Sequence, residues 1–139
     1  MKNILTFLSV LVLVGCGSGS DSGRNAVLAD LIGTWDASST YGQEVDEIYT
    51  VIKEDGSFID YDYDGDSYDQ GDNCYYRYEA GVLTDQGNGD FLIESNGEAD
   101  SVVKVKISGS RLTITSAMGS STSTKINRSE SDFTPLCNG

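Results

Sequence analysis

The sequence predicts an all-β fold: an antiparallel up-and-down meander of eight or nine short strands, with a short helix before the first strand. Three observations lead to this prediction. Apolar and polar residues alternate over several segments, and glycine-centred turn signals separate those segments at short, regular intervals. Pro135, the single proline, follows all of them. An antiparallel meander of this kind forms a barrel or a sandwich.

The elements follow one another in chain order. Residues 25–32 (NAVLADLI) place apolar side chains at helical spacing and predict the helix. Strands are predicted where β-branched and aromatic residues gather between turn residues, for example before Asp55-Gly56 and Ala80-Gly81. The predicted strands are residues 34–40, 45–53, 57–64, 73–79, 82–85, 90–94, 101–108, 111–116 and 121–127.

Alternation also predicts which side chains are buried. In residues 103–107, valine and isoleucine alternate with lysine, so the apolar set should face inward. By the same reasoning Ile59, Tyr61 and Tyr63 are expected to face inward, and the aspartates between them outward. Residues 48–52 are apolar on both faces, which predicts a strand that is covered on both sides.

The N-terminus has the parts of an export signal. Lys2 precedes an apolar run at residues 4–14 that is too short to span a bilayer, which takes about 20 residues. Leu13-Val14-Gly15-Cys16 resembles the lipobox of bacterial lipoproteins. The resemblance implies that residues 1–15 are removed as a signal peptide and that Cys16 carries acyl chains such as palmitate. The alternative is an ordinary secretory signal with an incidental cysteine.

This interpretation divides the rest of the chain into two parts. Residues 16–24, rich in glycine and serine, are expected to form a lipidated flexible tether. Residues 25–139 are expected to form one β domain. Gly17 follows the cysteine, whereas an aspartate there would resemble an inner-membrane retention signal. By analogy with Gram-negative lipoproteins, the expected location is the outer membrane, facing the periplasm or the cell surface.

Two further cysteines remain, Cys74 and Cys137. In an exported chain, oxidising surroundings make a disulfide between them the expected state. Two unpaired thiols are one alternative. Metal ligation by two distant cysteines is another, and it is disfavoured because the chain contains no histidine.

A second resemblance rests on Leu31-Ile32-Gly33-Thr34-Trp35, which follows the predicted helix. The stretch is similar to the Gly-x-Trp signature that opens the first barrel strand of lipocalins and lipocalin-like lipoproteins. The resemblance implies a small barrel with Trp35 plugging its base and Arg128 lying across the indole. It also implies a disulfide from the fourth strand to the C-terminal tail, and a small apolar ligand in the barrel or at its mouth.

The charge of the chain is strongly unbalanced, with a formal net charge of −13. Such acidity argues against a nucleic-acid partner and against direct adhesion to anionic lipid headgroups. Residues 44–72 hold eleven acidic residues and one basic residue, Lys53, whereas residues 101–129 hold five basic residues and no acidic ones. The uneven distribution fits either solubility in a salty habitat or a docking face for a basic partner.

One stretch within the acidic region resembles the start of an EF-hand calcium loop. Asp60, Asp62, Asp64 and Asp66 alternate with other residues, and Gly65 would permit a sharp turn. The twelfth loop position is Gly71 instead of the bidentate glutamate of a full loop. The alternative is a hairpin with solvated aspartates. No other cofactor is expected.

Tyrosines gather in the same part of the chain. Tyr61, Tyr63, Tyr76 and Tyr78 are candidates for contact with a ligand or a partner, because tyrosine combines an apolar face with a polar tip. The alternative is ordinary cross-strand pairing of aromatic side chains.

Catalysis finds little support in the sequence. It contains no histidine, no free thiol once the cysteines are assigned, and no nucleophile elbow or phosphate-binding glycine loop. The expected function is therefore non-catalytic, and two possibilities stay open. Either an open barrel binds a small apolar ligand, or a filled barrel docks another envelope protein through its acidic, tyrosine-rich face.

Overall fold

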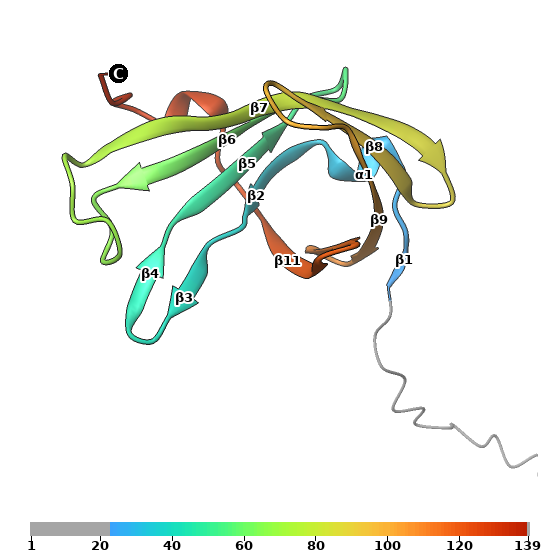
Figure 1. Cartoon of the computed structure of the whole chain (residues 1–139), viewed down its shortest axis with the longest axis horizontal. Coiled ribbons are helices and arrows are strands. Elements are labelled where there is room, and N and C mark those ends of the chain that lie inside the picture. Colours follow the sequence, from blue (N-terminus) through green and yellow to red (C-terminus); the bar gives the residue numbers. More distant parts are fainter. Residues whose placement is uncertain (1–22, 139) are drawn as a thin grey trace, which may run out of the picture.

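A computed structural model describes residues 23–138 of this protein. The predicted signal peptide (1–15), Cys16 and most of the predicted tether lie outside the described residues. The described chain is mostly β-strand and forms a closed antiparallel barrel of eight strands (Figure 1). Within the described residues, no helix has the length and apolarity needed to cross a bilayer. The predicted fold class is thus confirmed, and the architecture is consistent with a lipocalin-like fold.

The barrel strands pair in chain order, each antiparallel to the next, and the pairing of β8 with β9 and of β11 with β2 closes the circle. The short β1 adds a ninth strand, which pairs with β9. The barrel strands are β2 (Gly33–Asp36), β5 (Ile48–Ile52), β6 (Ser57–Asp64), β7 (Cys74–Gly87), β8 (Asp90–Ser95), β9 (Ser101–Ser108), β10 (Arg111–Ser116) and β11 (Gly119–Ile126).

The up-and-down order gives the barrel two distinct ends. The end at which β2 begins, here called the base, carries the β5–β6 and β9–β10 turns and the end of β11. The opposite end, here called the rim, carries the β6–β7 loop. It also carries a separate hairpin of β3 (Ser39–Tyr41) and β4 (Glu44–Asp46), inserted between β2 and β5. The hairpin and the β6–β7 loop extend to the left in Figure 1.

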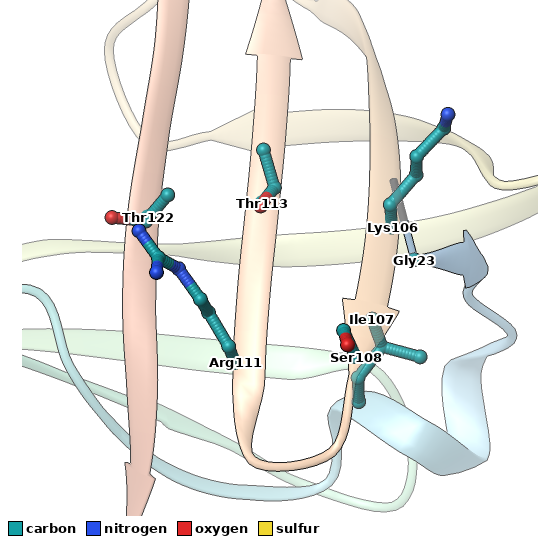
Figure 2. Close-up of a pocket in the computed structure, with 7 residues that line it drawn as sticks. All are labelled: Gly23, Lys106, Ile107, Ser108, Arg111, Thr113 and Thr122. Carbon is teal, nitrogen blue, oxygen red and sulfur yellow. The ribbon is translucent and has the colours of Figure 1, made fainter. Parts of the chain in front are cut away.

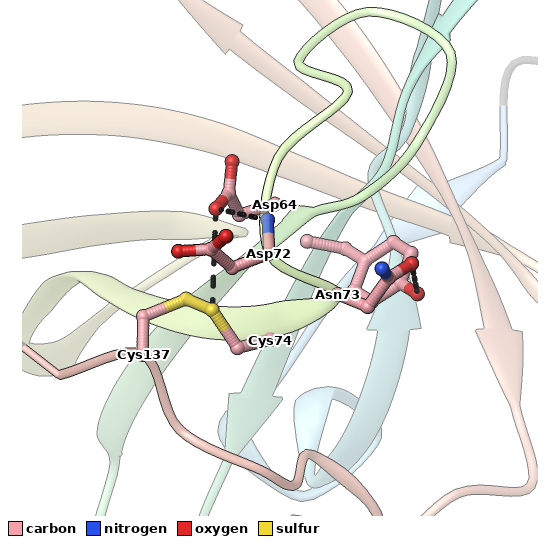
Figure 3. Close-up of a disulfide and its surroundings, with 6 residues drawn as sticks. Asp64, Asp72, Asn73, Cys74 and Cys137 are labelled. Atoms are coloured by element: carbon pink, nitrogen blue, oxygen red, sulfur yellow. Dashed lines mark hydrogen bonds between the residues drawn. A yellow bond between two sulfur atoms is a disulfide. The ribbon is translucent and has the colours of Figure 1, made fainter.

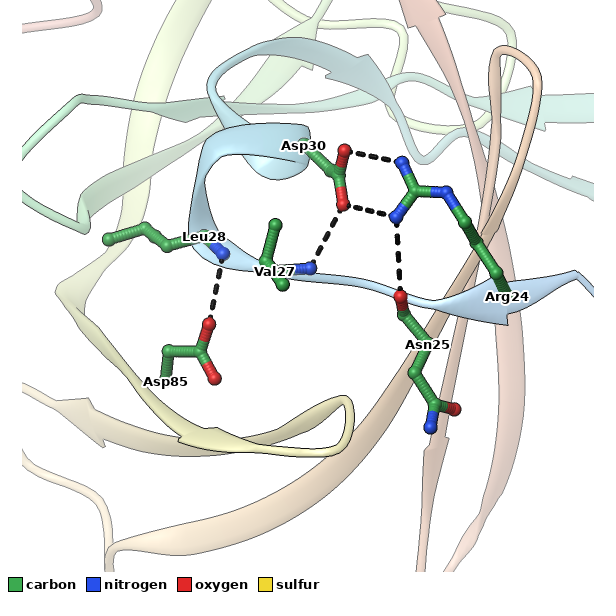
Figure 4. Close-up of polar contacts among 6 residues, drawn as sticks. All are labelled: Arg24, Asn25, Val27, Leu28, Asp30 and Asp85. Carbon is green, nitrogen blue, oxygen red and sulfur yellow. Dashed lines mark hydrogen bonds and ion pairs between the residues drawn. The ribbon is translucent and has the colours of Figure 1, made fainter.

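The N-terminal segment differs from the prediction of a helix over residues 25–32. β1 (Arg24–Asn25) pairs with β9, and Ala26 continues that pairing by donating its N–H to the Val105 carbonyl oxygen. Helix α1 is confined to Leu28–Leu31. The Asp30 carboxylate accepts the Val27 N–H and holds the Arg24 guanidinium, with N–O distances of 2.7 and 2.6 Å (Figure 4). Backbone pairing therefore outcompetes helix formation up to residue 26.

Two predicted strands, residues 73–79 and 82–85, are one long strand, β7, and the predicted turn at Ala80-Gly81 is wrong. Gly81 meets a steric need instead. A Cβ atom there would lie 2.3 Å from the Glu94 carbonyl oxygen and 2.9 Å from the Phe58 ring. Only glycine lets β6, β7 and β8 approach so closely.

The predicted strands 34–40 and 45–53 are each split. β2 ends at Asp36, whose carboxylate accepts the Ser38 N–H and turns the chain into the β3–β4 hairpin. β4 and β5 are separated at Glu47. The hairpin pairs only within itself and not with the barrel sheet.

An apolar cluster lies in the interior of the barrel. Trp35 is 1% exposed and donates its indole N–H to the Leu31 carbonyl oxygen at 2.7 Å. Phe91 is fully buried on the opposite wall. The interior cluster consists of Ala26, Leu31, Trp35, Ile52, Phe58, Phe91, Val103, Val105 and Leu112.

A second apolar cluster lies outside the barrel wall. Phe133, from the C-terminal segment (residues 127–138), stacks on Tyr61 with ring centroids 4.6 Å apart and also contacts Tyr49 and Tyr75. The segment begins at the base, where β11 ends, and reaches the rim, where Cys137 joins Cys74. It covers the outer face of β5, β6 and β7.

This second cluster reverses the predicted orientation of residues 59–63. Ile59 and Tyr61 pack outward under the C-terminal segment, whereas Phe58 belongs to the interior cluster. Asp60 lies on the same inward face and accepts a hydrogen bond from the Thr50 hydroxyl at 2.6 Å. Apolar and acidic residues do alternate between the two faces of this strand, but the apolar residues face the C-terminal segment and the aspartates face the interior.

The resemblance to lipocalins implied that Arg128 would lie across Trp35, and the structure differs. The ammonium group of Lys125 lies 5.3 Å from the Trp35 ring. The Arg128 guanidinium lies over Phe133, at 4.3 Å, and over Tyr49, at 4.8 Å, and it donates to the Tyr75 hydroxyl. Lys125 pairs with Trp35 in the β2–β11 register, so its side chain shares the inner face, whereas Arg128 follows the end of β11.

Candidate functional site at the rim of the barrel

Four aspartates form an acidic cluster at the rim: Asp46, Asp62, Asp66 and Asp69. Asp46 ends β4, Asp62 lies in β6, and the other two belong to the β6–β7 loop. Carboxylate oxygens of Asp46, Asp66 and Asp69 lie within 4.8 Å of one another. Asp62 is close enough to interact electrostatically with all three. The cluster therefore joins three segments that are separated in the sequence.

Hydrogen bonds between the loop and the β3–β4 hairpin bring these segments together. The Ser67 hydroxyl accepts the Val45 N–H, and the Asp66 carboxylate accepts the Glu47 N–H, each at 2.6 Å. Asp66 also accepts the N–H groups of Tyr68 and Asp69, which closes the loop around its carboxylate. Asp66 thus has an architectural role and orders the site.

The cluster concentrates negative charge in partly buried surroundings. Burial and then the charges of Asp69, Asp46 and Asp66 raise the pKa of Asp62 to about 6. Burial and the charges of Asp66 and Asp69 also raise the pKa of Asp46. The pKa of Asp66 is lowered although burial opposes its charge, because three backbone N–H groups favour the carboxylate. A cation bound here would relieve the repulsion.

One atom of the cluster lacks a partner. Asp62 Oδ1 is buried and, in the described part of the chain, accepts no hydrogen bond. A buried carboxylate oxygen without a donor costs free energy relative to one that is paired or solvated. The structure therefore leaves one acceptor at this site to be satisfied by a cation or by a donor from another molecule.

The aspartates of the predicted calcium loop do not converge on one point. Asp60 lies deeper in the barrel with Thr50. Asp64 accepts the Asp72 N–H and lies beside Cys74, as Figure 3 shows. Asp62 and Asp66 belong to the acidic cluster, but their neighbours are Asp46 and Asp69, which lie outside the linear pattern. Since side chains along a strand are spaced too far apart to share one ion, only chain reversal brings carboxylates together.

The candidate tyrosines are also dispersed. Tyr61 is covered by Phe133, and Tyr63 packs against Tyr75. Tyr76 and Tyr78 are exposed on β7, the latter by 70%. A different pair borders the acidic cluster: Tyr41 of β3 and Tyr68 of the loop lie 5.3 Å apart, and each is about half exposed. We call these two residues the rim tyrosine pair.

The predicted disulfide between Cys74 and Cys137 is confirmed. It ties the C-terminal segment to the start of β7, next to Asp64 and the β6–β7 loop (Figure 3). Backbone hydrogen bonds between Tyr75 and residues 135 and 137 reinforce the link, at 2.9 and 3.0 Å. The disulfide thus holds the strand from which the loop begins.

Sequence reasoning missed Asp46, Asp69 and the rim tyrosine pair. All four lie in turns or in the short hairpin, where no periodicity relates one segment to another. The available signal was the density of acidic residues between residues 44 and 72. That density indicated the region, but it did not indicate which carboxylates would meet.

Comparison of the chain with protein-family models, curated proteins and solved structures gives no match. Interpretation of the site therefore rests on the geometry described above.

Asp60 generates a prediction about pH. Burial raises its pKa to about 6, although the Thr50 hydroxyl opposes the shift. Because the folded state then binds the proton more tightly than the unfolded state, stability should rise as the pH falls from 7 towards 5. Asp60→Asn should raise the free energy of unfolding at pH 7 by up to about 2 kcal/mol and weaken this dependence, to which Asp62 contributes in the same direction. Urea unfolding at both pH values measures the effect.

The matched control is Asp100→Asn, which removes an exposed carboxylate outside the barrel strands. It should leave the pH dependence unchanged. Below about pH 4, loss of the Arg24–Asp30 pair should lower stability, because hydrogen bonding to Arg24 lowers the pKa of Asp30 to about 2. A stability that falls steadily from pH 7 to pH 5 in the wild type would contradict the role assigned to Asp60.

Proposed function

We propose that this protein is a lipid-anchored lipoprotein of the cell envelope whose filled barrel is a non-catalytic docking module. Its acidic rim binds a basic partner protein of the envelope. The observation that carries the proposal is the acidic cluster with its unpartnered Asp62 oxygen, bordered by the exposed rim tyrosine pair.

The packing of the interior favours docking over a ligand in the lumen. Each barrel strand contributes inward side chains, including Trp35 and Phe91, which are almost completely buried. A small apolar ligand in the lumen would have to displace some of them. The expectation of a ligand-binding barrel gains no support from this arrangement, and it stays a prediction.

The chemistry of the rim fits lysine and arginine side chains. The carboxylates of Asp46, Asp66 and Asp69 lie close enough together to attract one cation, and their partly buried surroundings strengthen that attraction. Tyr41 and Tyr68 offer aromatic faces on which a guanidinium or an ammonium group can pack. Complementary charge of this kind increases the association rate and the specificity of protein partners.

The lipid anchor is supported by the sequence around Cys16 and by the topology of the domain. The described chain begins with β1, which pairs with the base-side end of β9. The β6–β7 loop and the β3–β4 hairpin lie at the rim. A tether attached near the base would leave the rim free to meet a partner.

A second candidate function is calcium binding at the same cluster. The unpartnered Asp62 oxygen and the three carboxylates within 4.8 Å of one another favour it. Calcium prefers oxygen ligands, and extracellular sites hold it with Kd values of about 10⁻⁴–10⁻³ M. Asp46, Asp66 and Asp69 would supply the carboxylate oxygens that lie close together, and the unpartnered Asp62 oxygen would be a fourth ligand.

The anchor is tested by Cys16→Ser. We expect the variant to move from the membrane fraction to the soluble fraction of cells, because two or more acyl chains are what makes such an anchor stable. Cell fractionation with a high-salt wash measures the distribution. Cys74→Ser combined with Cys137→Ser removes the other cysteines and should leave the chain on the membrane. Retention of Cys16→Ser after the wash would refute the anchor.

Docking is tested with a hexa-arginine peptide as the probe. Asp46→Asn combined with Asp69→Asn should weaken peptide binding about tenfold, since each removed surface charge pair contributes up to about 1 kcal/mol. Titration calorimetry at low and physiological salt measures the change. The matched control, Glu98→Gln combined with Asp100→Asn, removes the same charge from an exposed turn. Equal weakening in both double variants would show attraction by net charge alone and refute a specific site.

Calcium binding predicts a gain in stability. At a concentration ten times its Kd, calcium should add about 1.4 kcal/mol to the free energy of unfolding, measured as a higher melting temperature. Asp62→Asn should abolish the gain, whereas Asp72→Asn, at an exposed loop position, should retain it. An unchanged melting temperature in millimolar calcium would exclude the ion.

A further inference from the structure

We infer that a cationic groove at the base of the barrel binds a phosphate group of the lipid headgroups beneath the protein. This inference rests on the proposed lipid anchor, and it adds the orientation in which the anchored domain sits. The groove lies on the outer face of β9, β10 and β11 and has a volume of about 310 Å³. It is lined by Gly23, Lys106, Ile107, Ser108, Arg111, Thr113 and Thr122 (Figure 2).

The strand register places the polar groups of this groove side by side. Thr113 of β10 pairs with Lys106 of β9 on one side and with Thr122 of β11 on the other. The Arg111 side chain extends towards Thr122, as Figure 2 shows. Lys106 and Arg111 therefore flank adjacent hydroxyl groups on one outer face, with the Lys106 ammonium group directed away from Arg111 in Figure 2. Cations and hydroxyl groups are the donors that phosphate oxygens accept.

The two cations stand out because the other basic side chains are engaged. Of the nine lysines and arginines, Lys2 lies outside the described residues, which leaves eight. Between residues 23 and 138, the Lys106 and Arg111 side chains make no ion pair or hydrogen bond. The engaged six are Arg24 with Asp30, Lys53 and Arg77 with Glu130, Lys104 with Asp90, Lys125 over Trp35 and Arg128 over Phe133.

The position of the groove selects the membrane as the source of the phosphate. Gly23, the first described residue, is part of its lining. Only residues 17–22 separate Gly23 from the proposed anchor at Cys16. Six residues of glycine- and serine-rich chain span about 13 Å root-mean-square. Headgroups would therefore face the groove at a millimolar effective concentration, so that a weak site suffices.

The net charge of −13 does not prevent this contact. Exposed charges more than about 8 Å away are largely screened at physiological salt, and the acidic cluster lies at the rim, the opposite end of the barrel. Residues 101–128 contain no aspartate or glutamate. On the adjoining elements, Asp30 and Asp90 are each paired with a cation, and Asp36 of β2 accepts the Ser38 N–H. Asp21 of the tether lies outside the described residues. The acidity of the chain therefore argues against contact between lipid headgroups and its other faces, but it does not exclude contact at this groove.

The first measurement uses the chain with Cys16→Ser, so that it does not depend on acylation. Glycerophosphoethanolamine, a soluble headgroup, is titrated into the isotope-labelled protein while amide signals are followed by NMR. Signals of residues 106–113 should shift with a midpoint in the millimolar range. Lys106→Gln combined with Arg111→Gln should weaken binding about tenfold. Lys104→Gln, the control on the same strand, removes a lysine that pairs with Asp90 outside the groove and should have little effect.

The second measurement uses the acylated chain in vesicles of phosphatidylcholine and phosphatidylglycerol, whose headgroups carry no primary amine. An amine-reactive reagent should label Lys106 several-fold more slowly than in detergent. A lysine placed at the rim by Gln43→Lys, in the exposed turn of the β3–β4 hairpin, should be labelled at an unchanged rate. The absence of shifts with the soluble headgroup would overturn the inference. Binding of inorganic phosphate without protection of Lys106 on vesicles would assign the groove to free phosphate and likewise overturn it. Failure of acylation would refute the proposed anchor, and the NMR titration would still report on the groove.

Discussion

The outer apolar face of β5, β6 and β7 must be covered, and the C-terminal segment covers it. Phe133 supplies the apolar contact, and Arg128 packs over Phe133 and Tyr49. The disulfide to Cys74 fixes the segment in place. Because this cover exists, Ile59 and Tyr61 of β6 can face away from the barrel while Asp60 faces the interior. The inward position of Asp60 and Asp62 is thus a consequence of how the C-terminal segment packs, whereas hydrogen bonds of the β6–β7 loop order the rest of the acidic cluster.

The sequence carried enough information for the barrel and too little for the site. Alternation in residues 103–107 and the glycine turns predicted the meander, and the cysteine count predicted the disulfide. In residues 59–63, alternation identifies two faces but not which of them faces inward, since that depends on the distant Phe133. Lys125 takes the place over Trp35 expected for Arg128 because strand register, which sequence spacing does not determine, sets the inner face. The acidic cluster depends on chain reversal at the rim, so a linear Asp-x-Asp pattern could not locate it.

The groove at the base and the acidic cluster at the rim carry opposite charges. Antiparallel order places the β9–β10 turn, with Lys106 and Arg111, at the end where the chain enters the domain. The same order places the carboxylates of Asp46 and Asp69 at the other end. In the proposed anchored protein, the base would face the lipid and the rim would face a partner. The composition alone indicated only an acidic protein.

The pairing at the free edge of β7 has a consequence for biosynthesis. Near Cys74, β7 has β6 on one side and only a parallel bridge from Tyr75 to Leu136 on the other. Leu136 and Cys137 follow every barrel strand in the chain, and synthesis proceeds from the N-terminus. Until residues 133–137 are in place, this edge of β7 is unpaired and the outer aromatic surface of β5 and β6 is exposed. Unprotected edges of this kind invite aggregation, so the molecule is most prone to aggregate before residues 133–137 have packed against β7.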